Sequence, residues 1–156
     1  MKKAFTMIEL IFVIVIIGIL AAVAMPRLAA NRDNATSSIC AYEVGQLVQE
    51  IGNSYNKNGY SKFQNITIAD ISSIRTNVTP AGSGISEAAT TTVNNTGVTY
   101  YCKGDAVAKI TSTLTGADYI LKIEDKNPTS PAALGAKKKL INQNILKANG
   151  TREYQL

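Results

Sequence analysis

The chain has 156 residues, a formal net charge of +5 and no histidine, with 46% hydrophobic and 17% charged residues. It therefore lacks the commonest general base and the commonest metal ligand, and it contains no glycine-rich phosphate loop and no cysteine pair with zinc spacing. These features predict that the chain is not an enzyme and has no cofactor. Its basic residues form no dense face with interleaved aromatic residues, so binding to nucleic acid is possible but has no support in the sequence.

The first predicted element is an apolar helix over residues 5–25, with Lys2 and Lys3 before it and Pro26 after it. At about 1.5 Å per residue it is about 31 Å long, which is enough to cross the hydrocarbon core of a bilayer. Glu9 is the one charged residue inside this stretch. Inserting a carboxylate costs up to about 3 kcal/mol at the bilayer centre, so Glu9 is a candidate functional residue whose partner is a cation.

An ordinary secretory signal peptide is the alternative interpretation of this stretch. Such a signal has a basic region, an apolar region and a cleavage site after small residues, and residues 22–24 (Ala-Val-Ala) fit that site. Glu9 argues against it, because an export signal that is cut off and discarded has no use for a buried charge.

The residues MKKA followed by FTMIELI resemble the N-terminus of type IV pilins and pseudopilins, and the resemblance covers about residues 1–32. It implies that prepilin peptidase cuts between Ala4 and Phe5 and that the new amino group of Phe5 is methylated. The family usually has glycine at the position of Ala4. The resemblance also implies that Glu9 meets the amino terminus of a neighbouring subunit during assembly, where carboxylate and ammonium neutralise each other in surroundings of low dielectric constant.

Two further residues match the helix-weakening positions of that family, Gly18 and Pro26. Glycine costs about 1 kcal/mol relative to alanine inside a helix, and proline removes a backbone donor. The resemblance implies that the helix melts between these positions in assembled filaments. The alternative is that Gly18 is a small packing point and that Pro26 is only a kink.

The helix is predicted to continue through residues 27–58 as an amphipathic half and to end at Asn58-Gly59. Apolar residues recur along it at steps of three and four. They are Cys40, Val44, Leu47, Val48, Ile51 and Tyr55.

Residues 60–97 are rich in Ser, Thr, Asn and Gly and are predicted to form a long loop with a helical turn or two around residues 66–74. Several later segments alternate or favour strands and predict a small antiparallel sheet of three or four strands. A short helix is predicted to start at Ser130-Pro131 and to end at Asn149-Gly150. The strand segments are residues 90–93, 98–102, 106–115 and 119–123, with a last edge strand at 154–156.

Cys40 lies on the apolar face of the predicted helix, and Cys102 lies on a strand expected to pack against that face. A helix-to-sheet disulfide is therefore sterically plausible, and in an oxidising compartment it would contribute about 4 kcal/mol to stability. Two buried reduced thiols are the alternative. Better-known pilins usually have their bridge near the C-terminus, so this pairing departs from that pattern.

Two groups of charged residues invite a functional interpretation, and for each the simpler alternative is preferred. Residues 137–139 form a run of three lysines, which is interpreted as a solvated helix face. The other group has the oxygen ligands that calcium prefers, but a solvated turn is the preferred interpretation. Its members are Asp118, Glu124, Asp125 and Asn127.

These expectations combine into an α+β fold, in which a long N-terminal helix, transmembrane in its first half and amphipathic in its second, packs on a small antiparallel sheet. The predicted parts are a leader at residues 1–4, a transmembrane and filament-core helix at 5–26 and a globular pilin-like domain at 27–156. The resemblance implies an inner-membrane protein of bacteria with one membrane pass and a periplasmic C-terminal domain, which becomes extracellular or stays periplasmic in a filament.

The resemblance implies a structural subunit of a type IV pilus or of a type II secretion pseudopilus. Its implied partners are copies of itself, other pilins or pseudopilins, prepilin peptidase, the inner-membrane assembly machinery and membrane lipid. One alternative is a minor pseudopilin of a secretion or DNA-uptake system. Another, from a different class, is a monomeric periplasmic binding domain with a plain membrane anchor.

Overall fold

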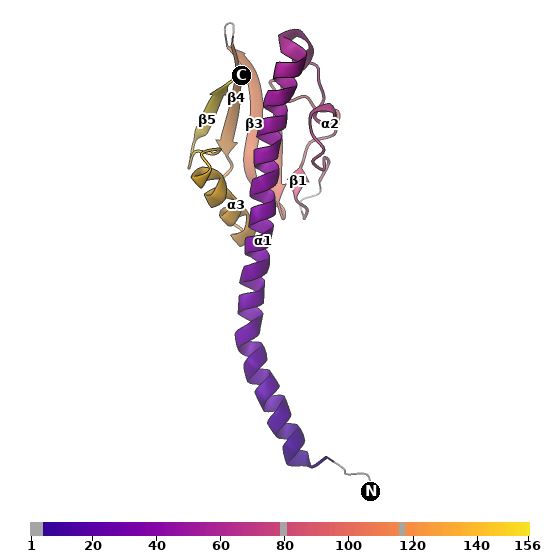
Figure 1. Ribbon diagram of the computed structural model, residues 1–156, viewed down its shortest axis with the longest axis vertical. Coiled ribbons are helices and arrows are strands. Elements are labelled where there is room, and N and C mark those ends of the chain that lie inside the picture. Colours follow the sequence, from indigo (N-terminus) through magenta and orange to yellow (C-terminus); the bar gives the residue numbers. More distant parts are fainter. Residues whose placement is uncertain (1–4, 79–80, 116–117) are drawn as a thin grey trace. The chain divides into compact units, whose positions relative to one another are not determined.

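The computed structural model describes residues 5–78, 81–115 and 118–156 (Figure 1). The chain divides into two compact units, Met1–Asp33 and Asn34–Leu156, and helix α1 contributes residues to both. The predicted boundary between residues 26 and 27 stays a prediction. The elements in chain order are α1 (Met7–Phe63), α2 (Ile68–Ile71), β1 (Gly84–Ile85), β2 (Val98–Cys102), β3 (Asp105–Thr115), β4 (Asp118–Asp125), α3 (Pro131–Asn142) and β5 (Thr151–Gln155).

The first unit, as far as the structure describes it, is a short entry segment and the N-terminal half of α1. Its large apolar side chains are exposed, from 41% for Ile16 to 85% for Phe5. The first buried residue of α1 is Ser37, which already belongs to the second unit. The helix is thus apolar on all sides in its first half and has no core of its own to cover that surface.

The second half of α1 is amphipathic, as its spacing predicts. Its buried positions follow the steps of three and four residues that place them on one face. Gly59 departs from helical geometry with φ 66° and ψ 173°, at the predicted helix end, and a further turn continues to Phe63. The buried residues of the face are Ser37, Cys40, Ala41, Val44, Leu47 and Ile51.

The sheet is antiparallel throughout, with the strand order β1-β2-β3-β4-β5. Strand β2 alternates between buried and half-buried residues, so Val98, Tyr100 and Cys102 share the buried face, as predicted. In Figure 1 the second half of α1 and α3 lie on the same side of the sheet, and a single hydrophobic core includes residues of both helices and of β2, β3 and β4. The predicted α+β class is confirmed.

Three details of the prediction are wrong. The first strand of the sheet is the two-residue β1, which lies inside the segment 60–97 that was predicted to be a loop. Residues 90–93 form no strand of the sheet; Thr92 makes an isolated bridge with Thr67, and Val93 O accepts a hydrogen bond from Ser112 N. Helix α3 ends at Asn142 and not at residue 149, because Asn144 takes a positive φ of 62° and the chain turns back so that Leu146 is buried. The predicted last edge strand is present as β5, but it begins at Thr151 and not at residue 154.

Candidate functional site

The N-terminus of α1 is closed by a reciprocal pair of hydrogen bonds between Thr6 and Glu9. The Glu9 carboxylate oxygen Oε2 accepts a bond from Thr6 N at 2.9 Å and from Thr6 Oγ1 at 2.6 Å, and Glu9 N donates to Thr6 Oγ1 at 3.4 Å. This is a capping box, in which a threonine and a glutamate three residues later satisfy free helix N–H groups. The spacing Thr-x-x-Glu was present in the sequence but was not used to predict this role.

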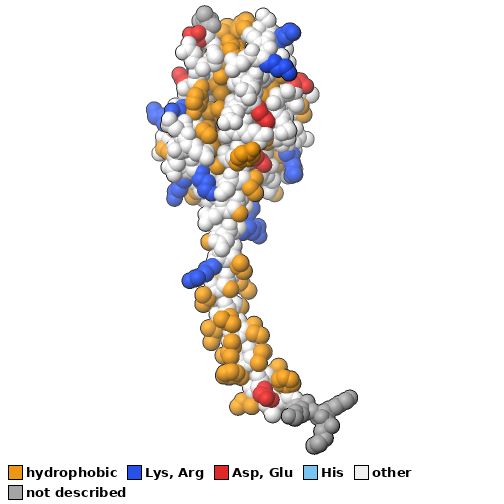
Figure 2. Space-filling view, viewed as in Figure 1, with side chains coloured by type: hydrophobic (Ala, Val, Ile, Leu, Met, Phe, Trp, Pro, Cys, Tyr) orange, Lys and Arg blue, Asp and Glu red, His pale blue; other side chains and the backbone are white. Residues whose placement is uncertain are grey.

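The surface around Glu9 is apolar and exposed. Phe5, Ile8, Phe12 and Val13 line a shallow hollow of about 350 Å³ together with Glu9. Figure 2 shows the acidic side chain at the end of a helix that is covered by hydrophobic side chains. A continuous exposed apolar surface is typical of a region that contacts lipid or another protein. Among the described residues, one helix, α1, is long and apolar enough to cross a bilayer.

Gly18 and Pro26 both lie inside α1. A Cβ atom added to Gly18 would meet no atom within 4 Å, so no close contact in the chain requires glycine there. Pro26 cannot donate the backbone hydrogen bond that an interior helix position normally makes. The helix-weakening role of these two residues stays a prediction.

A disulfide ties α1 to the sheet. The Sγ atoms of Cys40 and Cys102 are 2.06 Å apart, and the two Cα atoms are 5.9 Å apart. Both residues are at most 1% exposed. Ser83 Oγ lies 3.8 Å from Cys40 Sγ and accepts a hydrogen bond from Lys103 N, so the loop before β1 closes over the bridge. The disulfide joins the amphipathic half of α1 covalently to β2.

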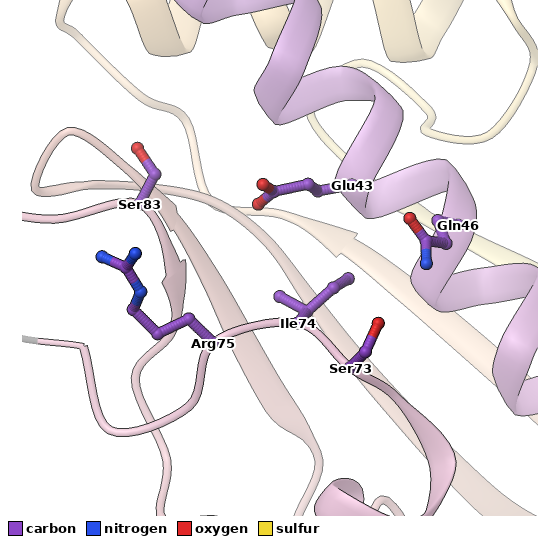
Figure 3. A pocket seen from close by; sticks show the side chains of 6 residues that line it. All are labelled: Glu43, Gln46, Ser73, Ile74, Arg75 and Ser83. Atoms are coloured by element: carbon purple, nitrogen blue, oxygen red, sulfur yellow. The ribbon is translucent and has the colours of Figure 1, made fainter.

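A polar pocket of about 580 Å³ lies beside this bridge (Figure 3). One wall is α1, and Glu43 accepts a hydrogen bond there from the buried Tyr100 hydroxyl. Burial raises the pKa of Tyr100, and the hydrogen bond to Glu43 and its negative charge raise it further. The lining holds one carboxylate and one guanidinium but no nucleophile paired with a base. The lining residues are Glu43, Gln46, Ser73, Ile74, Arg75 and Ser83.

The predicted solvated turn around Asp125 is wrong for Asp125 itself, whose side chain has no solvent exposure. Its oxygens accept hydrogen bonds from Asn127 N at 2.9 Å and Asn149 N at 2.8 Å, and Lys137 Nζ lies 2.6 Å away. The Lys137 ammonium group therefore neutralises the buried Asp125 carboxylate. Within the described parts of the chain, no group of three or more Asp, Glu, His or Cys residues is placed to hold a metal ion.

The predicted solvated lysine face is also wrong for two of its three members. Lys137 forms the pair with Asp125, and Lys139 Nζ donates to Asn34 O at 3.2 Å and to Ser38 Oγ at 2.6 Å. Lys138 is exposed. The sequence could not show this, because the partners are more than 100 residues from Lys139 and on another helix.

Comparison with protein families matches the prokaryotic N-terminal methylation motif to residues 1–25. No curated protein and no solved structure matched the chain. The match covers Phe5, Glu9 and Gly18, the residues that the sequence singled out in this segment, and it includes the predicted cleavage point after Ala4. The chain thus carries at its N-terminus the methylation motif that is the signature of type IV pilins and pseudopilins.

Proposed function

We propose that the chain is the precursor of a structural subunit of a type IV pilus or of a type II secretion pseudopilus. The observation that carries the proposal is the combination of the methylation motif with a helix whose first half is apolar on all sides and exposed. A helix of that kind is stable only where lipid or other helices cover it. The motif supports a structural role for the chain.

Prepilin peptidase would remove residues 1–4 and leave Phe5 as the methylated amino terminus. Residues 5–26 would hold the subunit in the bacterial inner membrane until assembly machinery extracts it. In the filament, the same apolar surface would exchange lipid for the corresponding helices of neighbouring subunits. The C-terminal domain would then lie on the periplasmic side, where oxidising conditions favour the Cys40–Cys102 disulfide.

Glu9 would have two roles in this scheme. In the single chain its carboxylate caps the helix through Thr6. During assembly it would pair with the amino terminus of a neighbouring Phe5, because a charge among packed apolar helices is costly unless an opposite charge neutralises it. The two roles are separable, since glutamine also serves as the last residue of a capping box but carries no charge.

The test is to express Glu9→Gln, Glu9→Ala and Thr6→Ala in the native bacterium and to measure cleavage, membrane insertion and recovery in sheared filaments. Glu153→Ala is the control, because Glu153 is an exposed carboxylate on β5. We expect Glu9→Gln and Glu9→Ala to be cleaved and inserted but excluded from filaments, and Thr6→Ala and the control to assemble. Assembly of Glu9→Gln at the wild-type level would reject the charge pairing. If Glu9→Ala had no effect other than slightly better membrane insertion, a monomeric anchored domain would be favoured.

Processing is tested by the intact mass of the protein purified from its native membrane without reductant. A chain that starts at Phe5 with one added methyl group supports the proposal. A start after Ala24, or an uncut Met1, would reject it.

A further inference from the structure

The polar pocket beside the disulfide carries two opposite charges that do not neutralise each other. Glu43 lies on α1 and Arg75 lies between α2 and β1, and both line this pocket within the second compact unit. Among the described residues, Glu43 and Arg75 form no ion pair, and the Arg75 guanidinium has no hydrogen-bond partner. In Figure 3 both charged groups lie in the space between α1 and the segment of residues 73–75. The pocket therefore offers a carboxylate and a guanidinium to one bound molecule.

Both walls of the pocket are held by contacts that no ligand would have to make. On α1, the Tyr100 hydroxyl of β2 donates a hydrogen bond to Glu43 Oε2 and so fixes that carboxylate. On the opposite wall, Ile85 N donates to Arg75 O at 2.9 Å. Gly84 permits this close approach, because an added Cβ there would lie 2.6 Å from Arg75 O. The fold thus sets the shape of the pocket in advance, which lowers the entropic cost of binding.

The two charges decide which class of ligand fits. A simple anion would gain the pairing with Arg75 but would face the carboxylate of Glu43, and a simple cation would meet the reverse conflict. A zwitterion satisfies both groups, because its carboxylate accepts two N–H groups of the guanidinium while its ammonium group donates to Glu43. Gln46 also lines the pocket, and its Nε2 donates to Glu50 Oε1 at 2.7 Å. The carbonyl oxygen of Gln46 is therefore a further acceptor for an ammonium group.

The size and the polarity of the pocket restrict the ligand further. Its volume of about 580 Å³ falls within the range of about 300–1,000 Å³ that is usual for small-molecule sites. Ile74 is the apolar member of the described lining, so the pocket offers little surface to a large apolar group. A free amino acid or a dipeptide has a suitable size and carries both charges at its ends.

We propose that this pocket binds a small zwitterion, a free α-amino acid or a dipeptide, with Arg75 on its carboxylate and Glu43 on its ammonium group. Ser83 Oγ accepts a hydrogen bond from Lys103 N at 3.0 Å, so the Ser83 hydroxyl keeps its own proton to donate to the ligand carboxylate. The inference concerns the second compact unit and does not rest on processing of the N-terminus or on assembly into a filament.

The test is calorimetric titration of the full chain, in an uncharged detergent with the disulfide intact, with the free α-amino acids and glycylglycine. We expect at least one of these probes to bind with a Kd of about 1 mM or lower. Binding should shift the NMR signal of the Ile74 δ1 methyl group and leave that of Ile123 in the sheet unchanged. The N-acetylated and the amidated forms of the same probe should each bind at least about tenfold more weakly. The proposal is overturned if no probe binds, or if either modified form binds as well as the zwitterion.

Two variants assign the two ends of the ligand. Arg75→Met should weaken binding of the zwitterion about tenfold and leave binding of the amidated form unchanged, since that form has no carboxylate. Glu43→Gln, which keeps an acceptor for the Tyr100 hydroxyl, should weaken the zwitterion by a similar factor and leave the N-acetylated form unchanged. The controls Lys122→Met and Glu153→Gln remove one exposed pair outside the pocket and should change no affinity. A variant that weakens modified and unmodified ligands alike would reject recognition by charge.

Discussion

Lys137 Nζ lies 2.6 Å from Oδ2 of Asp125, whose side chain is fully buried. Asp125 ends β4, Lys137 lies in the middle of α3, and Asn149, which donates its N–H to the same carboxylate oxygen, precedes β5. One carboxylate therefore links the end of β4 to α3 and to the residue before the turn into β5.

We predict that Lys137→Met lowers the free energy of unfolding by about 3–5 kcal/mol, because it leaves a buried carboxylate without its cation. The control is Lys122→Met, which breaks the pair with Glu153; both of those side chains are about half exposed, so we expect a loss of at most about 1 kcal/mol. Urea denaturation of the full chain in detergent measures both. Equal losses of unfolding free energy in the two variants would show that the buried pair stabilises the fold no more than the exposed pair.

Stability should fall as the pH falls below about 5. Burial raises the pKa of Asp125, but the bond from Lys137, the N–H groups of Asn127 and Asn149 and the charge of Lys137 outweigh burial, so this pKa is lowered. A carboxyl group with a lower pKa in the folded state stabilises the fold above its unfolded value of about 3.9 and loses this contribution as protons bind to it.

Asp105 adds to the same dependence on pH. Burial raises its pKa, but the N–H groups of Ser130 and Thr129, each 2.6 Å from Oδ2, lower it by more. We predict that Asp125→Asn makes the curve of unfolding free energy against pH flatter between pH 5 and pH 2.5, and that the remaining slope decreases again in Asp125→Asn/Asp105→Asn. A slope unchanged by Asp125→Asn would contradict this assignment.

The disulfide should account for a large part of the stability of the second unit. It closes a loop with a sequence separation of 62, for which chain entropy gives about 4 kcal/mol. We expect Cys40→Ser/Cys102→Ser to lose about this amount in urea denaturation without reductant. Since both cysteines are buried, the native chain should also resist alkylation under reducing conditions until denaturant is added. Rapid alkylation of the native chain would show that the bridge opens locally.

Gly135 should be intolerant of a side chain although it lies inside α3. Alanine there would place its Cβ 2.9 Å from Ser37 Cβ and 2.3 Å from Ser37 Oγ, and overpacking of this kind costs about 1–3 kcal/mol. Gly52→Ala on α1 is the matched control, because its new Cβ meets its nearest atom, Leu156 Cδ2, at 3.9 Å. We predict that thermal unfolding shows a lower Tm for Gly135→Ala and a higher Tm for Gly52→Ala, which gains up to about 1 kcal/mol of helix propensity. A stabilised Gly135→Ala would contradict the close packing of α3 on α1.

Local patterns in the sequence determined the long helix and its change from apolar to amphipathic. They also determined the strand alternation of β2 and β4 and the interruption of the helix at Gly59. Each of these depends on residues within a few positions of one another, so the periods of two and 3.6 residues are visible in one sequence. The capping role of Glu9 was equally local and could have been predicted from the spacing Thr-x-x-Glu.

The tertiary structure alone decided what the charged residues do. Asp125 and the lysines of α3 have no local pattern that distinguishes a solvated face from a buried pair, because their partners are brought to them by the packing of α3 against α1 and the sheet. The same packing places Gly135 on Ser37. The sequence by itself therefore determined an apolar helix with the methylation motif and a half-buried sheet. Only long-range packing decided which polar groups hold the domain together and at which residue of α1 burial begins.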